Sequence, residues 1–175
     1  VYIELFVKTA TVLEDTEDNG FEYISPRIVA LRQNTANLFL DKPNSKCIIF
    51  VANRIIALLA EPMLSQYLDS LGLNKKCEMI VGLNKGNNTA AIKTVKDTNT
   101  ATELNRKIRE FNEGRTQILI GTSVVEEGLD IQDCNVVMAY TELFTAKSYI
   151  QMKGRARDIN SDFLIFTIDI CKFLW

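Results

Sequence analysis

Five short runs of apolar residues constrain the fold of this 175-residue chain more than any other feature. They are CIIFVA at 47–52, CEMIVG at 77–82, QILIG at 117–121, CNVVMAY at 134–140 and FLIFTI at 163–168. Each run is shorter than a typical helix and lacks the polar alternation of a strand with one face in water. Such runs are typical of strands buried on both faces, which belong to parallel sheets.

The segments between these runs have apolar residues at helical spacing, and they predict helices at 25–41, 55–71, 101–111 and 145–153. Ser25 and Pro26 suit the N-cap and first position of the first helix. Pro62 is expected to kink or break the second helix, and Thr100 or Thr102 to cap the third. Alternating strands and helices predict an α/β domain whose mostly parallel sheet is covered on both faces.

The length of the chain suits one domain with a sizeable core. We expect that domain to occupy 25–169, with 1–24 belonging to a preceding module or linker and 170–175 starting a following segment. The chain begins with Val and ends with FLW, which suggests a piece of a longer protein. No apolar run is long enough to span a bilayer and no signal peptide is visible, so no membrane partner is expected.

The sequence contains no histidine, which excludes histidine general bases, Ser-His and Cys-His dyads and most zinc sites. The four cysteines form no CxxC pair, and three lie at or beside apolar runs, so free buried thiols and a cytoplasmic or nuclear protein are expected. The net charge of −2 means that any nucleic acid must be held by a local basic patch.

The loop after QILIG carries polar residues at the end of a predicted strand, where ligands collect in parallel sheets. Thr122 and Ser123 offer hydroxyl and amide groups that suit a phosphate oxygen. The carboxylates of Glu126, Glu127 and Asp130 follow and could accept a ribose hydroxyl or a lysine. Taken alone, an ordinary capped turn explains this loop better.

The run QMKGRAR at 151–157 ends the fourth predicted helix with two arginines. Guanidinium groups bind phosphate well, and an arginine near a γ-phosphate stabilises the charge that develops in phosphoryl transfer. The alternative is a solvated basic helix end favoured by the helix dipole. For a lone GRAR this alternative is the better explanation.

Together these motifs change that balance. GTSVVEEGLDI, CNVV and SYIQMKGRAR closely resemble motifs V and VI of superfamily 2 helicases, and CIIFVANR resembles motif IV. They occur in the expected order and spacing from about Ser25 to about Asp169. On this resemblance the chain is identified as the second RecA-like domain of such a helicase, which implies a three-layer αβα fold.

The ending SYxQxKGRAR differs from the HRxGRxGR of DEAD-box helicases and the QRxGRTGR of the Hef type. It looks most like Dicer, with RIG-I-like receptors close behind. IVGLNKGN resembles a divergent copy of the glycine-rich, RNA-contacting segment of these proteins, without the His or Arg usually found between its glycines.

The resemblance implies two groups of site residues. The nucleotide group faces ATP: Arg155 and Arg157 reach its phosphates across an interdomain cleft, Gln151 helps to order that cleft, and Asp130 lies near the ribose with Gly128 allowing close approach. The second group contacts the RNA backbone without reading its sequence, and consists of Asn53, Arg54, Lys85, Thr122 and Ser123.

The chain has no GxxxxGK[ST] phosphate loop and no acid pair for Mg²⁺ at a strand end. ATP and Mg²⁺ should therefore be bound mainly by a first RecA-like domain, and this domain alone should be inactive, with no metal ligands of its own. The other partners that the resemblance implies are double-stranded RNA, an insertion domain of the same protein and a protein cofactor that binds double-stranded RNA.

The leading hypothesis is the helicase C-terminal domain of a Dicer-like protein, part of an RNA-stimulated ATPase that supports small-RNA processing, with ribonuclease III activity elsewhere in the protein. A RIG-I-like or Dicer-related RNA helicase without nuclease domains is the first alternative. A module that holds double-stranded RNA or a partner protein without hydrolysing ATP is the second. Duplex DNA is the weaker choice of substrate.

Overall fold

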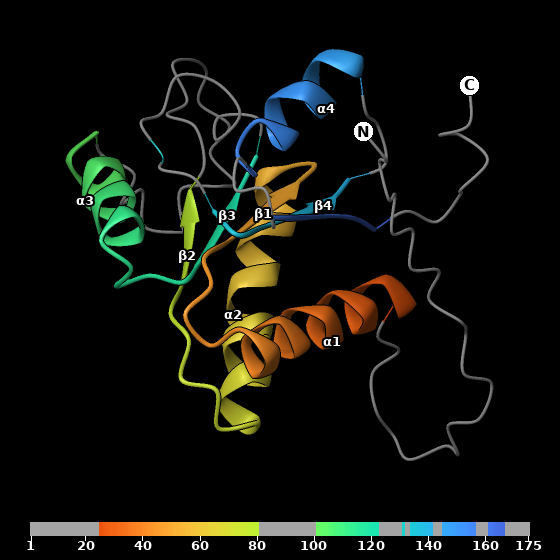
Figure 1. The fold of residues 1–175 in the computed structure, drawn as a ribbon, viewed down its shortest axis with the longest axis vertical. Helices are drawn as coiled ribbons and strands as arrows, with labels where there is room; N and C mark the ends of the chain where they lie inside the picture. Colours follow the sequence, from red (N-terminus) through yellow and green to blue (C-terminus); the bar gives the residue numbers. More distant parts are fainter. Residues whose placement is uncertain are drawn as a thin grey trace, which may run out of the picture.

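The computed structural model describes residues 25–80, 101–122, 131, 134–141, 145–156 and 161–166. Within them, five strands form one parallel sheet in the order β2-β3-β1-β4-β5 (Figure 1). The strands are β1 (Cys47–Val51), β2 (Cys77–Ile80), β3 (Ile118–Gly121), β4 (Val136–Tyr140) and β5 (Asp162–Ile165). The α/β fold with a mostly parallel sheet is thus confirmed. The segments at 1–24 and 170–175 lie outside the described residues.

The strand register brings the carboxyl ends of four strands to the same level. Gly121 at the end of β3 pairs with Phe50 of β1 on one side and with Ile80 of β2 on the other. Val51 at the end of β1 pairs with Tyr140 at the end of β4. Residues that follow these strands therefore emerge along one edge of the sheet, where ligands of parallel sheets bind.

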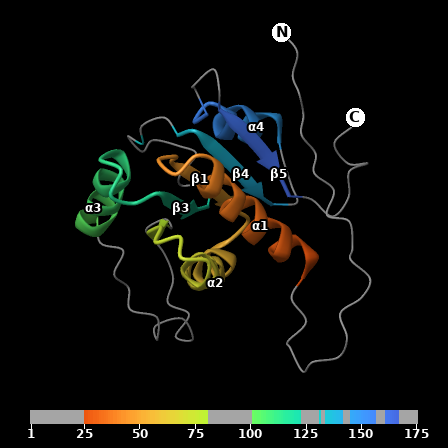
Figure 2. The same ribbon diagram turned by 60° about the horizontal axis from the view of Figure 1, so that its bottom comes forward.

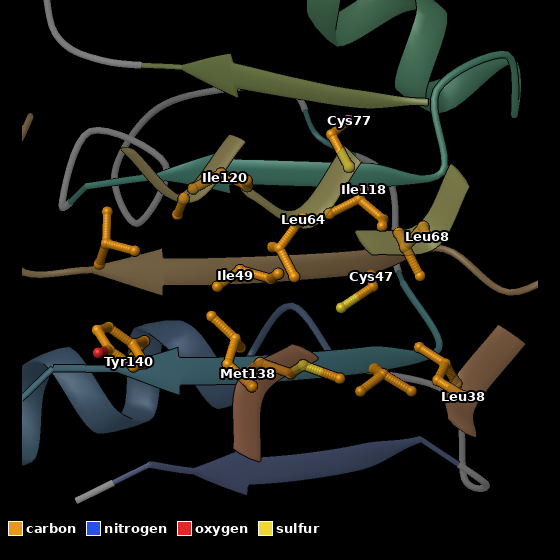
Figure 3. Packing of buried hydrophobic residues seen from close by; sticks show 14 of the residues in the cluster. Leu38, Cys47, Ile49, Leu64, Leu68, Cys77, Ile118, Ile120, Met138 and Tyr140 are labelled. Atoms are coloured by element: carbon orange, nitrogen blue, oxygen red, sulfur yellow. The ribbon is translucent and has the colours of Figure 1, made fainter. Parts of the chain in front are cut away.

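In the described part of the chain, two helices cover each face of the sheet (Figure 2). Side chains of α1 (Pro26–Asp41) and α2 (Arg54–Ser70) pack on one face, and those of α3 (Ala101–Asn112) and α4 (Ala146–Lys153) on the other. The pleat of β1 explains this division, because successive side chains of a strand point to opposite faces. Cys47 and Ile49 contact the α1 and α2 layer, as Figure 3 shows, and Ile48 and Phe50 the α3 and α4 layer.

The expectation of a break at Pro62 is wrong. Helix α2 continues through this residue, from Arg54 to Ser70. Pro62 is exposed to solvent. The buried residues of α2 lie both before and after it in the sequence, and they are Ala57, Ala60, Leu64 and Leu68. Packing of both halves on the sheet outweighs the roughly 3 kcal/mol that an interior proline costs a helix.

Several predicted boundaries move by one or two residues. Pro26 is the first residue of α1 as predicted, but the Ser25 side chain makes no cap hydrogen bond. Thr102 lies inside α3 and is therefore not its cap, while Thr100 is outside the described residues. Strand β4 begins at Val136 rather than at 134. None of the helices in the described part of the chain is long and apolar enough to cross a membrane.

Candidate functional site

The structure describes half of the predicted site residues: Asn53, Arg54, Thr122, Gln151 and Arg155. The other predicted residues lie outside the described part of the chain, and these are Lys85, Ser123, Gly128, Asp130 and Arg157. The site is therefore built from the five described residues and from the neighbours that hold them.

Asn53 begins α2 at the carboxyl end of β1. Its backbone is extended, and its side-chain Oδ1 accepts a hydrogen bond from the Ile56 amide at 3.0 Å, so Asn53 is the N-cap of the helix. Capping uses only the oxygen of the exposed side chain, and its NH₂ group is the part suited to donate to a phosphate. Arg54 follows as the first helical residue and is half-buried.

Thr122 lies on the same edge of the sheet. It directly follows Gly121, the last residue of β3, and is half-buried. Because β1 and β3 are adjacent and end at the same level, Thr122 and Asn53 follow the ends of neighbouring strands. The structure thus brings two of the predicted RNA-contacting residues to one edge, in agreement with the sequence pattern.

Helix α4 is fixed at its start by a capping box that the sequence reading did not identify. Thr145 Oγ1 accepts from the Ser148 amide at 3.1 Å, and Ser148 Oγ accepts from the Thr145 amide at 3.0 Å. Tyr149 packs edge-on against Phe163, with ring centroids 5.4 Å apart. The Thr-x-x-Ser spacing was a usable signal for this start, although a capping box more often ends in Glu or Gln.

Helix α4 also presents different sides of its second half to the core and to solvent. Met152 is 1% exposed and belongs to the core, Gln151 is half-buried, and Ile150 is 67% exposed. At Gly154 an added Cβ would meet the Ile150 carbonyl oxygen at 3.1 Å. Glycine therefore allows the tight turn that delivers Arg155, whose amide donates to the Met152 carbonyl at 3.1 Å.

Arg155 is held against the segment that precedes β4. Its Nη1 donates to the Ile131 carbonyl oxygen at 3.3 Å, and its own carbonyl accepts from the Cys134 amide at 3.2 Å. Ile131 is the residue immediately after Asp130, so the basic turn and the end of the acidic loop meet. The sequence could not show this contact, since both of its acceptors are main-chain oxygens, which every residue carries.

A network of charged side chains joins the edge strand β2 to α3, and sequence reading missed it as well. Buried Glu78 of β2 lies 3.0 Å from Lys76 Nζ, 3.4 Å from an Arg106 nitrogen and 3.5 Å from Lys107 Nζ. Lys107 also donates to the Met79 carbonyl at 2.8 Å. A cation on an edge-strand carbonyl, with a helix alongside, protects that edge from pairing with other chains.

The outer part of this network is a half-buried set of ion pairs on α3. Arg106 lies 2.6 Å from both Glu103 and Glu110, which are three and four residues away in the helix. Lys76 contacts Glu110 at 2.7 Å. The hydrogen bonds from Lys76 and Arg106 lower the pKa of Glu110 to about 2. This network fastens α3 to β2 and carries no predicted site residue.

Comparison with known families and structures gives one consistent result. Residues 30–160 match the family model of the helicase conserved C-terminal domain. Similar solved structures include the Pyrococcus furiosus Hef helicase domain, with a TM-score of 0.56, 24% identity and coverage of 82% of this chain and 26% of that one. The C-terminal domain of the DEAD-box protein Dbp5 gives 0.57 and 24%, with coverage of 83% of this chain and 73% of that one. At this identity the likeness shows the fold alone, which is RecA-like.

Two curated relatives are more similar in sequence. Endoribonuclease Dicer homolog 2 of Arabidopsis thaliana is 35% identical over 122 residues, which is 70% of this chain and 8% of the relative. Dicer-like protein 1 of Aspergillus niger is 31% identical over 144 residues, 82% of this chain and 9% of the relative. The chain therefore spans less than a tenth of the length of these two relatives.

Proposed function

The chain belongs to the helicase conserved C-terminal domain family and is a Dicer-type superfamily 2 member of it. We propose that it supplies half of an ATPase site whose activity is stimulated by double-stranded RNA. The observation that carries this proposal is the meeting of the basic turn after α4 with the end of the GTSVVEEGLDI loop, through Arg155 and Ile131. The turn and the loop are the two parts that phosphate chemistry requires of this domain.

The donors described at this side of the sheet fit the phosphate groups of ATP. The guanidinium of Arg155 carries N–H groups in a planar fork that matches phosphate oxygens, and Arg157 would add a second. ATP, when bound, would supply the phosphoryl group that is transferred to water, in a site that this domain completes together with its companion. Arg155 and Arg157 would neutralise the negative charge of the phosphates, and Gln151 would order the cleft. Asp130, beside Gly128, would accept a hydrogen bond from a ribose hydroxyl.

Mg²⁺ fits this domain less well. The described site residues offer N–H and O–H donors, whereas Mg²⁺ prefers carboxylate oxygens and waters. We therefore assign the metal, and most of the ATP binding, to a first RecA-like domain of the same protein, and we expect this domain alone to be inactive. An insertion domain of the same protein would complete the enclosure of the RNA.

The edge formed by Asn53, Arg54 and Thr122 would contact the RNA, together with Ser123 and Lys85. Amide, hydroxyl and guanidinium donors recognise phosphate and sugar without reading sequence, as suits a duplex recognised by its shape. In the whole protein this activity would support small-RNA processing in the cytoplasm or nucleus, with ribonuclease III activity elsewhere in the protein and a protein cofactor that binds double-stranded RNA.

The test measures ATP turnover by the full-length protein with duplex RNA, with duplex DNA of the same sequence and without nucleic acid. We expect stimulation by duplex RNA above that by DNA. The double variant Arg155→Ala/Arg157→Ala should lose about 10³-fold or more in turnover, the range seen when a phosphate-contacting arginine is removed, while its affinity for duplex RNA stays within a few-fold. Arg109→Ala, on the exposed side of α3, is the matched control.

Two results would refute the proposal. One is a wild-type protein whose ATP turnover does not respond to duplex RNA. The other is a double variant that still hydrolyses ATP at the wild-type rate. Tight binding of duplex RNA without any turnover would instead support the alternative of a non-hydrolysing binding module.

A further inference from the structure

Helix α4 buries fewer of its side chains than the other helices in the described part of the chain. Met152 is the one buried residue of its eight, whereas α1 has five buried residues, α2 four and α3 three. Tyr149 adds the ring contact with Phe163. Most of the surface of α4 is therefore not used by the core of this domain.

The side of α4 opposite Met152 carries an exposed isoleucine. Ile150 is 67% exposed, the largest value among the large apolar side chains of the described residues. It lies two residues from Met152, and such residues point to nearly opposite sides of a helix. Lys147 and Lys153, three residues before and after Ile150, are exposed on the same side. An apolar centre with charged residues around it has the composition of a protein interface.

Single exposed apolar residues are common on protein surfaces, so the position of Ile150 has to identify its partner. Ile150 directly precedes Gln151, and its carbonyl accepts from the Gly154 amide at 2.8 Å. Arg155 follows Gly154, and one turn of helix rises only about 5 Å. In Figure 1, α4 lies at the end of the molecule towards which β2 and β3 point. A domain that presents ATP to Arg155 must therefore approach this part of α4.

We propose that the exposed side of α4, defined by Lys147, Ile150 and Lys153, docks on the first RecA-like domain of the same protein when nucleotide is bound. This inference rests on the proposed function, to which it adds an apolar contact beside the phosphate contacts. The partner surface should be an apolar pocket with carboxylates beside it, which complements the isoleucine and the two lysines. The two curated relatives are long enough to carry such a domain, since this chain matches less than a tenth of each.

The docked isoleucine would act on closure of the two domains, without touching ATP. About two-thirds of the Ile150 side chain is exposed, so its burial should favour the closed state by roughly tenfold. The arginines that follow α4 would then lie at the phosphates in a larger share of the molecules. Ile150 is thus assigned as a positioning residue for the ATPase site.

The first measurement is iodoacetamide labelling of Ile150→Cys in the full-length protein, read as the mass of the peptide that carries position 150. The rate is compared without ligand, with duplex RNA alone, and with duplex RNA, ADP–beryllium fluoride and Mg²⁺ together. In the last state we expect labelling to be about tenfold slower, as for a closed state that holds about nine-tenths of the molecules.

Leu40→Cys is the matched control for labelling. Leu40 is 61% exposed and lies in the last turn of α1, shortly before β1 begins at the opposite edge of the sheet. Its labelling rate should be the same in every state. The three native cysteines in the described part of the chain are buried, and the peptide masses separate them from the introduced thiols.

The second measurement is ATP turnover with duplex RNA. Ile150→Glu should raise the ATP concentration at half-maximal turnover about tenfold, whereas Ile150→Leu should stay within about threefold of wild type. Leu40→Glu should leave it unchanged. A carboxylate three residues from Lys147 and Lys153 suits a helix, so α4 should still form in Ile150→Glu.

Three results would overturn the inference. One is equal labelling of Ile150→Cys in all states, and another is an Ile150→Glu variant with wild-type turnover. The third is protection of Ile150→Cys before nucleotide is added, which would assign this surface to duplex RNA or to a permanently docked domain. The proposed function fails separately, if the wild-type protein hydrolyses no ATP. The labelling rates then still decide whether α4 docks, because they require nucleotide binding and no turnover.

Discussion

Replacing Glu78 with glutamine should loosen α3 from the edge of the sheet. The Glu78 carboxylate faces three cations, of which Lys107 is the most buried, with a side chain 10% exposed and its Nζ 3.5 Å from the carboxylate. Lys76 and Arg106 are 45% and 34% exposed, so solvent weakens their contributions. The change keeps the shape of the side chain and removes its charge, which leaves Lys107 with the Met79 carbonyl.

The magnitude follows from the distance and the burial. Two unit charges 3.5 Å apart attract by about 5 kcal/mol at an effective dielectric constant of roughly 20. Removal of both groups from water offsets part of this attraction, and breaking a buried pair costs about 3–5 kcal/mol because one charge is left behind. Lys107 keeps its hydrogen bond to the Met79 carbonyl oxygen, which limits the loss. We therefore expect α3 to lose about 2 kcal/mol of local stability on the Glu78→Gln change.

Hydrogen–deuterium exchange of peptides from β2 and α3 in the intact protein measures this loss. A change of about 2 kcal/mol corresponds to roughly 30-fold faster exchange when opening is at equilibrium. Glu113→Gln is the matched control, because its pair with Arg115 is about half exposed and should contribute almost nothing. Adding Lys107→Met to Glu78→Gln removes the cation that has lost its partner. The loss of local stability in the double variant should therefore be smaller than the sum of the losses in the two single variants.

Two outcomes would refute this reasoning about Glu78. In one, the β2 and α3 peptides of Glu78→Gln exchange within threefold of wild type. In the other, the effects of Glu78→Gln and Lys107→Met are additive, which would mean that the two side chains do not interact.

Three further predictions concern other parts of the structure. Ser148→Ala removes half of the α4 capping box and should cost about 1 kcal/mol, seen as faster amide exchange across α4 only. Cys47, whose burial raises its thiol pKa well above the usual value, should resist iodoacetamide at pH 8 until denaturant is added, as peptide masses would show. Hydrogen bonds, first from Lys76 and to a smaller extent from Arg106, lower the pKa of Glu110 from 4.5 to about 2. The ionised Glu110 carboxylate therefore stabilises α3 fully above pH 4.5, and this stabilisation is lost as the pH falls towards 2. Pepsin cleavage within α3 should therefore increase as the pH falls from 4.5 towards 2. In the Glu110→Gln variant, pepsin should cleave α3 readily already at pH 4.5.

The sequence by itself determined the strands, the four described helices and the parallel sheet. These follow from local patterns, since the length of an apolar run and the spacing of apolar residues depend only on neighbours in the chain. The same patterns located the turn at Gly154 and the residues at the ends of β1 and β3, because parallel strands present their carboxyl ends at one edge. The buried free thiols of Cys47, Cys77 and Cys134 were predictable for the same reason.

Only the tertiary structure decided the strand order, the continuity of α2 through Pro62 and the partners of Arg155 and Glu78. The contact of Arg155 with Ile131 spans 24 residues and its acceptor is a main-chain oxygen. The identity of the accepting residue therefore does not predict it. The contact of Lys107 with Glu78 depends on α3 packing beside β2, and the proline in α2 is tolerated because buried side chains anchor the helix on both sides of it. Contacts of this kind are set by which surfaces meet after the chain has folded, which local periodicity does not record.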